Sequence, residues 1–497
     1  MQKALHLGRG IIYRSKLNQP DFEDFILPFS GKLRSNNRWV ILSKIIPWDE
    51  IDKKYSKGFA KSGMGAPAKS SRIAFGALLI KERLGLTDEE TVEQIIENPY
   101  LQYFLGYECY IDEAPFEASM MVHFRKRFDI KGISEINEKI INAGNKVQKK
   151  KGKDDDNNDK TGTPPNKGKL ILDATCSPAD IRYPTDLSLL NEGREKIEHI
   201  IDVLYEPLKD KEKKVRTYRR NARKDYLNIA KKKNVGRKEI RKGIGKQLRY
   251  LRRDLKHIKS LIRRSYLTSL SKKEYRDLLV IHELYRQQKY MYDNNTHKIE
   301  GRIVSISQPH IRPIVRGKAR AKVEFGAKLS VSLVNGYSYL EDLNWEPYNE
   351  SKDLIPVVER YKRAYGYYPK SLHVDKIYRT RNNILYCKGK GIRITGPPLG
   401  RPKKNVDHKK QRAVNRRDER DRIPIEGKFG QGKRRFSLNR IMAKLSCTSE
   451  TVIAIIFVVM NLEKRLAFLL LAILNAIKKW KDICTELLYI YILKEKY

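Results

Sequence analysis

The chain has 497 residues, which is long enough for two or three domains. Its 103 Lys and Arg residues against 59 Asp and Glu residues give a formal net charge of +44 and a pI near 9.9. This charge argues against a cationic partner and predicts a polyanionic one, of which nucleic acid is the first expectation, because neutralised phosphates release counterions. A structural basic protein and a membrane-surface binder are the alternatives.

Cysteine spacing and hydropathy further limit the classes of protein to which the chain can belong. The five cysteines, at positions 109, 176, 387, 447 and 484, form no CxxC pair, so we expect neither a zinc site nor a disulfide framework. Reduced thiols and the absence of a signal-like apolar core at the N-terminus predict a cytoplasmic protein. The apolar run Val452–Met460 is too short to cross a bilayer, and the run resumes at Leu466. We expect packing helices over 448–497 and no membrane partner, with an interfacial helix as the alternative.

The N-terminal part reads as helical after an unassigned segment over 1–64. Ser70 or Ser71 can cap one helix, and Thr87 with Glu90 forms a capping-box pattern that opens a second helix, which Pro99 ends. A third helix is expected over 116–128. These helices predict a helical DNA-binding domain of helix-turn-helix type over 65–146, although any small helical domain would look similar.

A low-complexity linker over 147–169 precedes the run KLILDAT, an apolar strand that ends at Asp173. The first core strand of a catalytic domain is thus expected within 170–189. A basic helical insertion follows over 190–300. It carries a heptad seam, which predicts a helical hairpin or short coiled coil with basic flanks that lie along DNA or simply face solvent; the seam residues are Ile244, Leu248, Leu251, Leu255, Ile258 and Ile262.

The remainder of the catalytic domain is expected over 301–447. Strands are predicted at 302–307 and 321–334, with a tight turn at Asn335-Gly336 and a helix over 353–365. A short strand then ends near Asp375, and GIRITGPP predicts another strand before a basic linker over 401–420. This order of elements predicts an α/β fold with a mixed sheet.

The segment 422–444 holds one carboxylate, Glu426, in a strongly basic helix-like stretch. Arg422 lies four residues before it and Lys433 seven after it, which brings the three side chains to within about 60° on a helix. They lie beside apolar residues Ile425, Phe429 and Phe436. An ion-paired surface helix is the simpler interpretation, and a metal-binding carboxylate beside phosphate-holding groups is the functional one.

Asp173 and Asp375 at strand ends join Glu426 as candidate metal ligands. Either aspartate alone could merely cap a turn. Three carboxylates brought together repel one another unless a cation lies between them, and carboxylate oxygens suit Mg²⁺ or Mn²⁺. Two such ions about 3.5–4 Å apart can activate water and stabilise the leaving oxygen in a phosphoryl transfer.

Three blocks of the sequence resemble the DDE transposases of bacterial insertion sequences. They are LILDATCSPADIRYPTDLSLLNEGRE (170–195), LHVDKIYRTRNN (372–383) and RIPIEGKFGQGKRRFSLNRIMAKL (422–445). The family's catalytic carboxylates fall on Asp173, Asp375 and Glu426, and the Arg and Lys of its Tyr-Arg-Glu-Lys signature fall on Arg422 and Lys433. The signature Tyr is missing, since Glu419 stands at its position.

The resemblance implies a ribonuclease H-like core with a helical N-terminal domain, and the insertion lies after the first core strand. It implies a homodimer that binds terminal inverted repeats in double-stranded DNA, cuts them with two Mg²⁺ or Mn²⁺ ions in the family's manner, and joins them to target DNA in the bacterial nucleoid. Phosphate contacts are expected from Arg422, Lys433, Arg434, Arg435 and Arg440. Trp345 could stack on a displaced base, although a core role is the simpler expectation. A nuclease without strand transfer and an inactive DNA-binding relative remain the alternatives.

Overall fold

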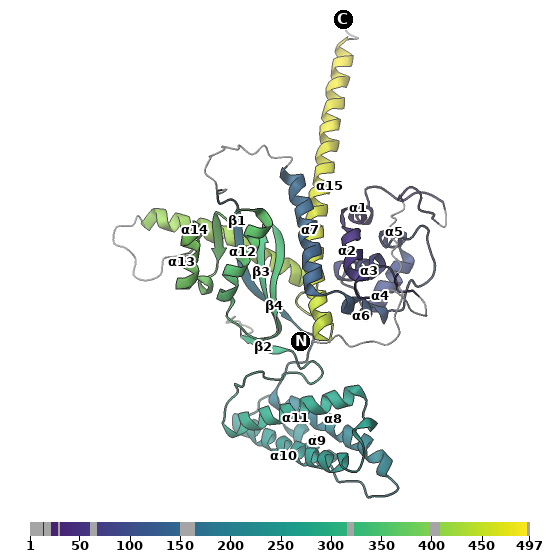
Figure 1. Cartoon of the computed structure of the whole chain (residues 1–497), viewed down its shortest axis with the longest axis vertical. Coiled ribbons are helices and arrows are strands. Elements are labelled where there is room, and N and C mark those ends of the chain that lie inside the picture. The colour runs from purple at the N-terminus through teal and green to yellow at the C-terminus, as the bar shows by residue number, and fades with distance from the viewer. Residues whose placement is uncertain are drawn as a thin grey trace.

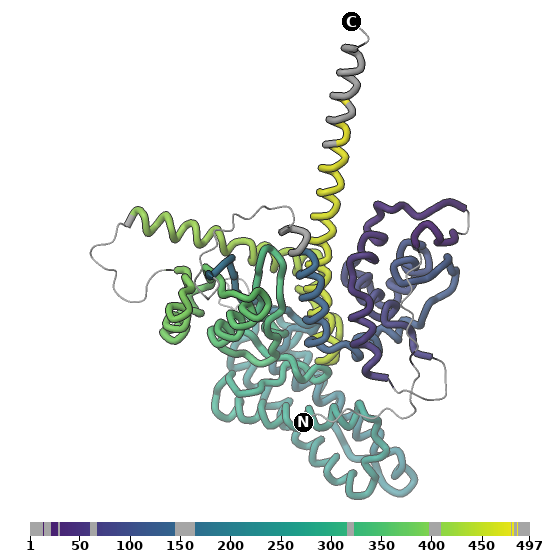
Figure 2. The backbone as a smooth tube through the Cα atoms, turned by 45° about the horizontal axis from the view of Figure 1, so that its top comes forward, coloured from purple at the N-terminus to yellow at the C-terminus, as the bar shows by residue number. Residues whose placement is uncertain are grey.

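The computed structural model describes residues 13, 21–27, 30–59, 67–149, 165–315, 323–396 and 408–494. Figure 1 shows three parts: a central sheet with its helices, a group of N-terminal helices beside the long helix α15, and a separate helical insertion. The tube in Figure 2 follows the same path from another side, with α15 between the sheet and the N-terminal helices.

The central sheet is mixed, as predicted. Its strands are β1 (Lys169–Pro178), β2 (Arg312–Val315), β3 (Val323–Val334), β4 (Tyr337–Asn344), β5 (Ser371–Val374) and β6 (Arg393–Ile394). β3 pairs antiparallel with β1, β2 and β4. β1 pairs parallel with β5, and β5 pairs parallel with β6. The order across the sheet is therefore β2-β3-β1-β5-β6, with β4 also paired to β3. This order agrees with the expected ribonuclease H-like core.

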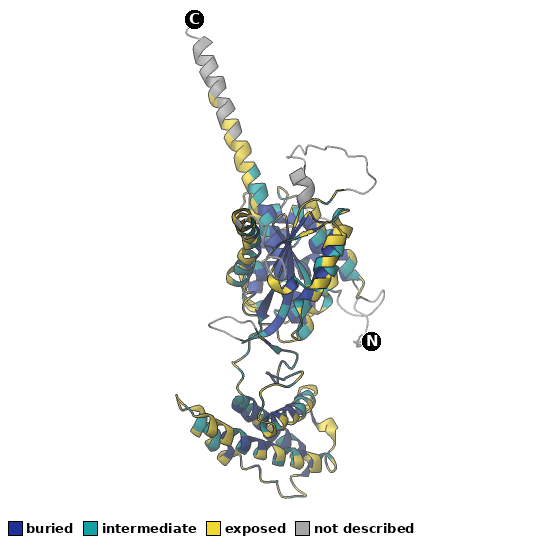
Figure 3. Cartoon of the chain, turned by 90° about the vertical axis from the view of Figure 1, so that its left-hand side faces the viewer, coloured by how far each residue is buried: buried dark blue, intermediate teal, exposed yellow. Residues whose placement is uncertain are grey.

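Helices cover both faces of the sheet because alternate residues of β1 are apolar on opposite sides. Leu170 and Leu172 face a cluster formed with α12 (Leu354–Tyr365) and α13 (Arg381–Gly389). Ile171 faces Ile425 on the other side, where α14 (His408–Arg435) packs. Figure 3 shows the strands buried between these two helical layers. Short 3-10 turns η3 (Glu350–Asp353) and η4 (Lys376–Tyr378) precede α12 and α13.

The N-terminal helices are α1 (Arg38–Ile45), α2 (Trp48–Ser56), α3 (Ser71–Leu84), α4 (Asp88–Glu97), α5 (Pro99–Phe104), α6 (Met120–Arg127) and α7 (Ile130–Lys149). The predicted caps are confirmed. Ser70 caps α3, and Thr87 and Glu90 bond reciprocally at the start of α4. Pro99 does not merely end α4, because it is also the first residue of α5, where its missing N–H is harmless.

The insertion is a bundle of four helices and not the predicted hairpin or coiled coil. It comprises α8 (Asp186–Tyr205), α9 (Arg219–Ala230), α10 (Arg237–Ile262) and α11 (Lys272–Asp293), with 3-10 turns η1 (Glu206–Leu208) and η2 (Leu267–Ser269). The heptad seam of α10 is buried against its neighbours in one hydrophobic cluster. The predicted strand at 302–307 is wrong, because Ile303 and Ile306 are buried in that same cluster and their backbone joins no sheet.

Two further expectations need correction. The part of the predicted basic linker that the structure describes, from His408 on, belongs to α14, and the helix continues through Pro424. Residues 397–407, the turn near 316–320 and the linker residues 150–164 lie outside the described residues, and α7 already extends to Lys149. The C-terminal part is one helix, α15 (Ser446–Lys494), and only its first half packs against the rest of the chain.

None of the helices in the described ranges is long and apolar enough to span a membrane. Among the cysteines whose side chains are described, Cys109, Cys176, Cys387 and Cys447 form no disulfide.

Candidate active site

Asp173 and Asp375 come together through the register of two parallel strands. Leu172 of β1 pairs with Val374 of β5, so the next residue of each chain segment is one of the two aspartates. β5 ends at Val374, and Asp375 accepts a hydrogen bond from the Lys376 backbone at 2.7 Å as the cap of η4. The end of β5 therefore leaves the two carboxylates next to each other, with Asp375 exposed.

The environment of Asp173 disfavours its charged form. Burial raises the pKa of its carboxyl to about 6, although a backbone hydrogen bond from Ala174 and the nearby Arg422 both act to lower it. The negative charges of Asp375 and Glu350 raise the pKa further. A half-buried carboxylate beside other carboxylates is the arrangement that a cation would stabilise.

Arg422 connects Asp173 to Glu426. Its guanidinium lies 3.3 Å from an oxygen of Asp173 and 2.9 Å from an oxygen of Glu426, one turn further along α14. Only 15% of the Asp173 side chain is exposed, against 55% for Glu426, so the site opens toward solvent on the Glu426 side. A positive group is thus already held between two of the three predicted carboxylates, and the donor set fits a hard divalent cation.

The packing of α14 explains how Glu426 reaches the sheet. Ile425 is fully buried against Ile171 of β1 and Leu333 of β3, with Phe429 packed at the edge of the cluster. Because Ile425 is fixed against the sheet, its neighbour Glu426 lies at the margin of the helix–sheet contact. Pro424 does not interrupt this contact, so Arg422 is helical, which the sequence alone left undecided.

The predicted phosphate contacts have different surroundings. Lys433 is half-buried, and Arg434 is exposed on the last turn of α14. Arg435 pairs with Glu463 of α15 at 2.9 Å, and Arg440 pairs with Asp180 after β1 at 2.8 Å. Arg435 and Arg440 therefore hold structural ion pairs in addition to any contact with a ligand.

A second group of potential ligands, which we did not predict from the sequence, joins β5 to the part of α14 that precedes Arg422. Ligand atoms of His373, Asp418 and Asp421 lie within 4.8 Å of one another. Asp418 is bound by Arg393 at 2.7 Å and Asp421 by Lys169 at 2.7 Å, so both carboxylates already have cationic partners. The sequence contains two signals for this group: His373 lies two residues before Asp375, and Asp418 and Asp421 lie three residues apart, on one face of a helix.

Trp345 has a structural role, as the simpler expectation held. Its ring is partly buried against the core that α15 shares with the sheet. The indole N–H donates to Glu450 at 2.8 Å, and the ring packs edge-on against His310 with 4.4 Å between centroids.

Comparisons with known proteins support the assignment of both regions. Residues 372–463 match a family model described as a transposase DDE domain, and residues 28–127 match one described as a transposase domain (DUF772). The first match includes Asp375 and Glu426, whereas Asp173 precedes it. The second match covers α1 to α6.

One curated relative is an uncharacterised protein, ORF8 in the nfe locus of Rhizobium meliloti. It is 33% identical over 150 residues, which is 30% of this chain and 66% of that protein. No solved structure matches the chain. Two separate regions of the chain thus match transposase-domain models, and the mixed α/β core agrees with a DDE catalytic domain.

Proposed function

We propose that this chain cuts the ends of its own mobile element and joins them to target DNA. The observation that supports this most directly is that strand register places Asp375 beside Asp173, while Arg422 bridges Asp173 and Glu426. In a chain with a net charge of +44, such a site suits a phosphate substrate.

The three carboxylates, Asp173, Asp375 and Glu426, would hold Mg²⁺ or Mn²⁺, two ions by the resemblance, which supply Lewis-acid activation of a water or 3′-hydroxyl and charge neutralisation at the scissile phosphate. The protein itself contributes position. β1 and β5 fix the two aspartates, and the buried Ile425 fixes the helix that carries Glu426.

Arg422 would change partners in this proposal. In the structure, its guanidinium pairs with Asp173 and Glu426. When the carboxylates hold metal ions, the Arg422 guanidinium would instead bind a phosphate beside the scissile bond. Its planar geometry suits bidentate contact with a phosphate. Lys433 and Arg434 lie two to three turns further along α14 and would extend the phosphate contacts.

Recognition of the inverted repeats is proposed for the helical domain over 65–146. The packing of this domain against the rest of the chain determines how its DNA specificity can be tested. Its core includes α1, α2 and α15 as well as α3 to α7, and Thr451 of α15 donates to the backbone oxygens of Arg125 and Phe128. The segment 65–146 by itself would lack these partners, so the specificity for element ends is best measured with the full chain.

A homodimer is proposed from the exposed half of α15. Leu466, Leu470, Ile473, Ile477 and Trp480 follow one another at alternating steps of four and three residues, which is the spacing of a coiled-coil seam. Leu466 is buried in the core, but Ile473, Ile477 and Trp480 are 43%, 59% and 72% exposed. A second copy of α15 presents a matching seam, and pairing of the two copies would bury these exposed apolar side chains.

Three substitutions test the proposed chemistry. We expect Asp173→Asn, Asp375→Asn and Glu426→Gln each to abolish cleavage of a plasmid that carries the element ends in Mg²⁺ while DNA binding is retained, because each removes a ligand charge and leaves the volume almost unchanged. Glu419→Gln, an exposed carboxylate on the same helix, is the matched control and should cleave normally.

The products of the cleavage reaction distinguish the three alternative functions. Joining of cut ends to a target plasmid supports transposition, whereas cleavage without joining supports a nuclease without strand transfer. No cleavage by the parent chain in Mg²⁺ or Mn²⁺ would support an inactive relative. Robust cleavage by any one of the three variants removes that residue from the proposed site.

A further inference from the structure

Helix α10 of the insertion is the most strongly basic helix of the described bundle. Its 26 residues include five arginines and five lysines against one glutamate and one aspartate. The two helices that flank its buried side differ, because α8 and α11 carry nearly balanced or acidic sequences. The positive charge of the insertion is therefore concentrated on one side of the bundle.

Six of these cations form one stripe, which we call the α10 basic stripe. At about 100° per residue they fall within a sector of about 100° on the helix surface, and they extend over about 32 Å. All six are exposed: Lys238, Lys242, Arg249, Arg252, Lys256 and Lys259. The two acidic residues of α10, Glu239 and Asp254, fall outside the sector.

The stripe cations make no ion pair or side-chain hydrogen bond with any residue that the structure describes. Three of the other four cations of α10 are different. Lys246 pairs with Asp225 at 2.7 Å, Arg241 donates to the Tyr292 backbone at 2.8 Å, and Arg253 pairs with Asp254 at 3.0 Å. The helix thus has cations that hold the bundle together and a separate set with no ion pair or side-chain hydrogen bond within the described bundle, although Arg249 lies near enough to Asp225 to lower the pKa of that carboxyl.

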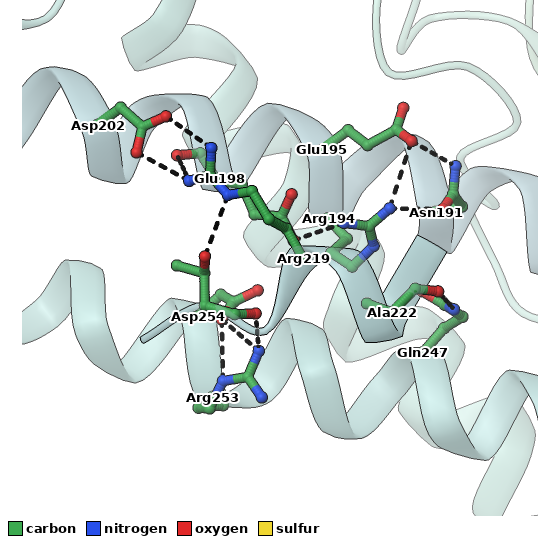
Figure 4. A network of polar contacts seen from close by, with 11 residues as sticks. Asn191, Arg194, Glu195, Glu198, Asp202, Arg219, Ala222, Gln247, Arg253 and Asp254 are labelled. Atoms are coloured by element: carbon green, nitrogen blue, oxygen red, sulfur yellow. Dashed lines mark hydrogen bonds and ion pairs between the residues drawn. The ribbon is translucent and has the colours of Figure 1, made fainter. Parts of the chain in front are cut away.

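A rigid bundle supports the stripe. On the seam side of α10, Leu248, Leu251 and Ile258 are buried against α8 and α11. Polar contacts add to this packing (Figure 4), since Gln247 donates to the Ala222 backbone of α9 at 3.0 Å and Arg219 of α9 pairs with Asp202 of α8 at 2.8 Å. The exposed cations are therefore presented on a fixed surface, which reduces the entropy lost when they bind a ligand.

The bundle lies beyond the end of the core toward which β1 runs. β1 runs from Lys169 past Asp173 to Pro178, and the chain enters α8 at Asp186. β5 is parallel to β1, so Asp375 at its end points in the same direction along the sheet. Figure 1 shows the insertion beyond that end of the strands. The carboxylates are therefore on the side of the core that faces the insertion.

We infer that the α10 basic stripe binds the phosphate backbone of duplex DNA outside the scissile site, without reading its sequence. The inference rests on the proposed action on DNA. The length of the stripe is close to one turn of B-DNA, about 34 Å. Six unpaired cations and no exposed aromatic residue among them fit phosphate contacts, which position the duplex, and not base contacts.

The test compares two full-length triple variants with the same loss of charge. Arg249→Gln, Arg252→Gln and Lys256→Gln together neutralise the centre of the stripe. Lys272→Gln, Lys273→Gln and Lys298→Gln neutralise three exposed cations elsewhere on the insertion. Binding to a duplex of random sequence is measured by fluorescence anisotropy across a salt series, without divalent metal so that no cleavage occurs.

We expect the stripe variant to bind at least tenfold more weakly at low salt, and to lower the slope of log affinity against log salt by about 2–3, because each lost phosphate contact removes about 0.9 from the slope. Element ends should lose the same factor as random DNA. The control variant should retain the parent slope. Equal affinities and slopes for the two variants would overturn the inference.

Two further measurements distinguish other ligands of the stripe, and distinguish a failure of this inference from a failure of the proposed active site. Tighter binding of the stripe to duplex RNA or to anionic phospholipid vesicles than to DNA at equal salt would also overturn the inference. A chain that binds DNA through the stripe but whose Asp173→Asn variant still cleaves would contradict the proposed site and leave the stripe intact. Unchanged helix content by circular dichroism excludes misfolding as the cause of a lost slope.

Discussion

Arg422 is the residue whose ion pairs in the structure differ most from its proposed role in the reaction. The sequence predicted that it contacts phosphate, and the structure shows its guanidinium paired with Asp173 and Glu426. Because the Arg422 guanidinium pairs with both carboxylates, it holds them close together. It also competes with the metal ion that they would bind.

That competition predicts an outcome for Arg422→Gln. We expect the variant to bind Mn²⁺ several-fold more tightly, because the positive guanidinium no longer occupies or repels that position, and to cleave element ends more slowly, because the phosphate contact is lost. Mn²⁺ binding is measured by the loss of the free-ion electron paramagnetic resonance signal. Arg416→Gln, an exposed arginine on the same helix, should change neither property. Weaker Mn²⁺ binding by Arg422→Gln would argue against competition.

At the scale of elements, the insertion behaves as a unit with its own core. The buried cluster of α8, α10 and α11 includes Leu251 and Ile281 but no strand of the sheet. Local sequence signals predicted the seam of α10 but not its partners, because a heptad specifies an apolar stripe and leaves open which helix covers it. The strand prediction over 302–307 was wrong for a related reason, because the alternating apolar residues of this segment face the helical bundle and not a sheet.

Leu251→Ala tests whether the seam stabilises the bundle. Leu251 is fully buried, so we expect a loss of about 2–5 kcal/mol in the free energy of unfolding of the insertion, from the smaller apolar side chain and the cavity it leaves. Urea denaturation followed by circular dichroism measures the loss. Leu279→Ala removes an equal side chain from an exposed position on α11 and should cost less than about 0.5 kcal/mol. Similar losses in the two variants would mean that the seam does not hold the bundle.

At the scale of the whole molecule, α15 links the parts of the chain. Its first half contributes Ile453 and Phe457 to the core beneath the N-terminal helices, and Asn461 donates to Asn137 of α7 at 2.9 Å and to the Ser338 backbone of β4 at 2.7 Å. Its second half extends away from the molecule. One helix therefore joins the two transposase domains and also presents the exposed seam.

The exposed seam predicts a dimer in solution. Light scattering after gel filtration should give twice the chain mass of 58.1 kDa for the parent. The double variant Ile473→Lys, Ile477→Lys should elute as a monomer, because two charges in the seam cannot be buried against a second helix. Asn475→Lys with Thr485→Lys adds the same charges away from the seam and should leave the dimer intact. A monomeric parent at every concentration, or a dimer that the seam variant does not weaken, would contradict the proposal.

The sequence alone determined the features that depend on neighbours along the chain. The caps of α3 and α4, the turn at Asn335-Gly336 and the strand that carries Asp173 followed from local chemistry. It also gave the three carboxylates as candidates, because their types and spacings match a family motif. The composition predicted an anionic partner, since net charge does not depend on the fold.

Only the tertiary structure decided how those residues meet. The parallel register of β1 and β5 sets Asp173 beside Asp375, and the burial of Ile425 sets Glu426 and Arg422 against the same edge. It also extended α14 through Pro424 and separated the paired cations of α10 from the unpaired stripe. These outcomes depend on packing between segments up to some 250 residues apart, such as Asp173 and Arg422 at a separation of 249, and no local pattern encodes them.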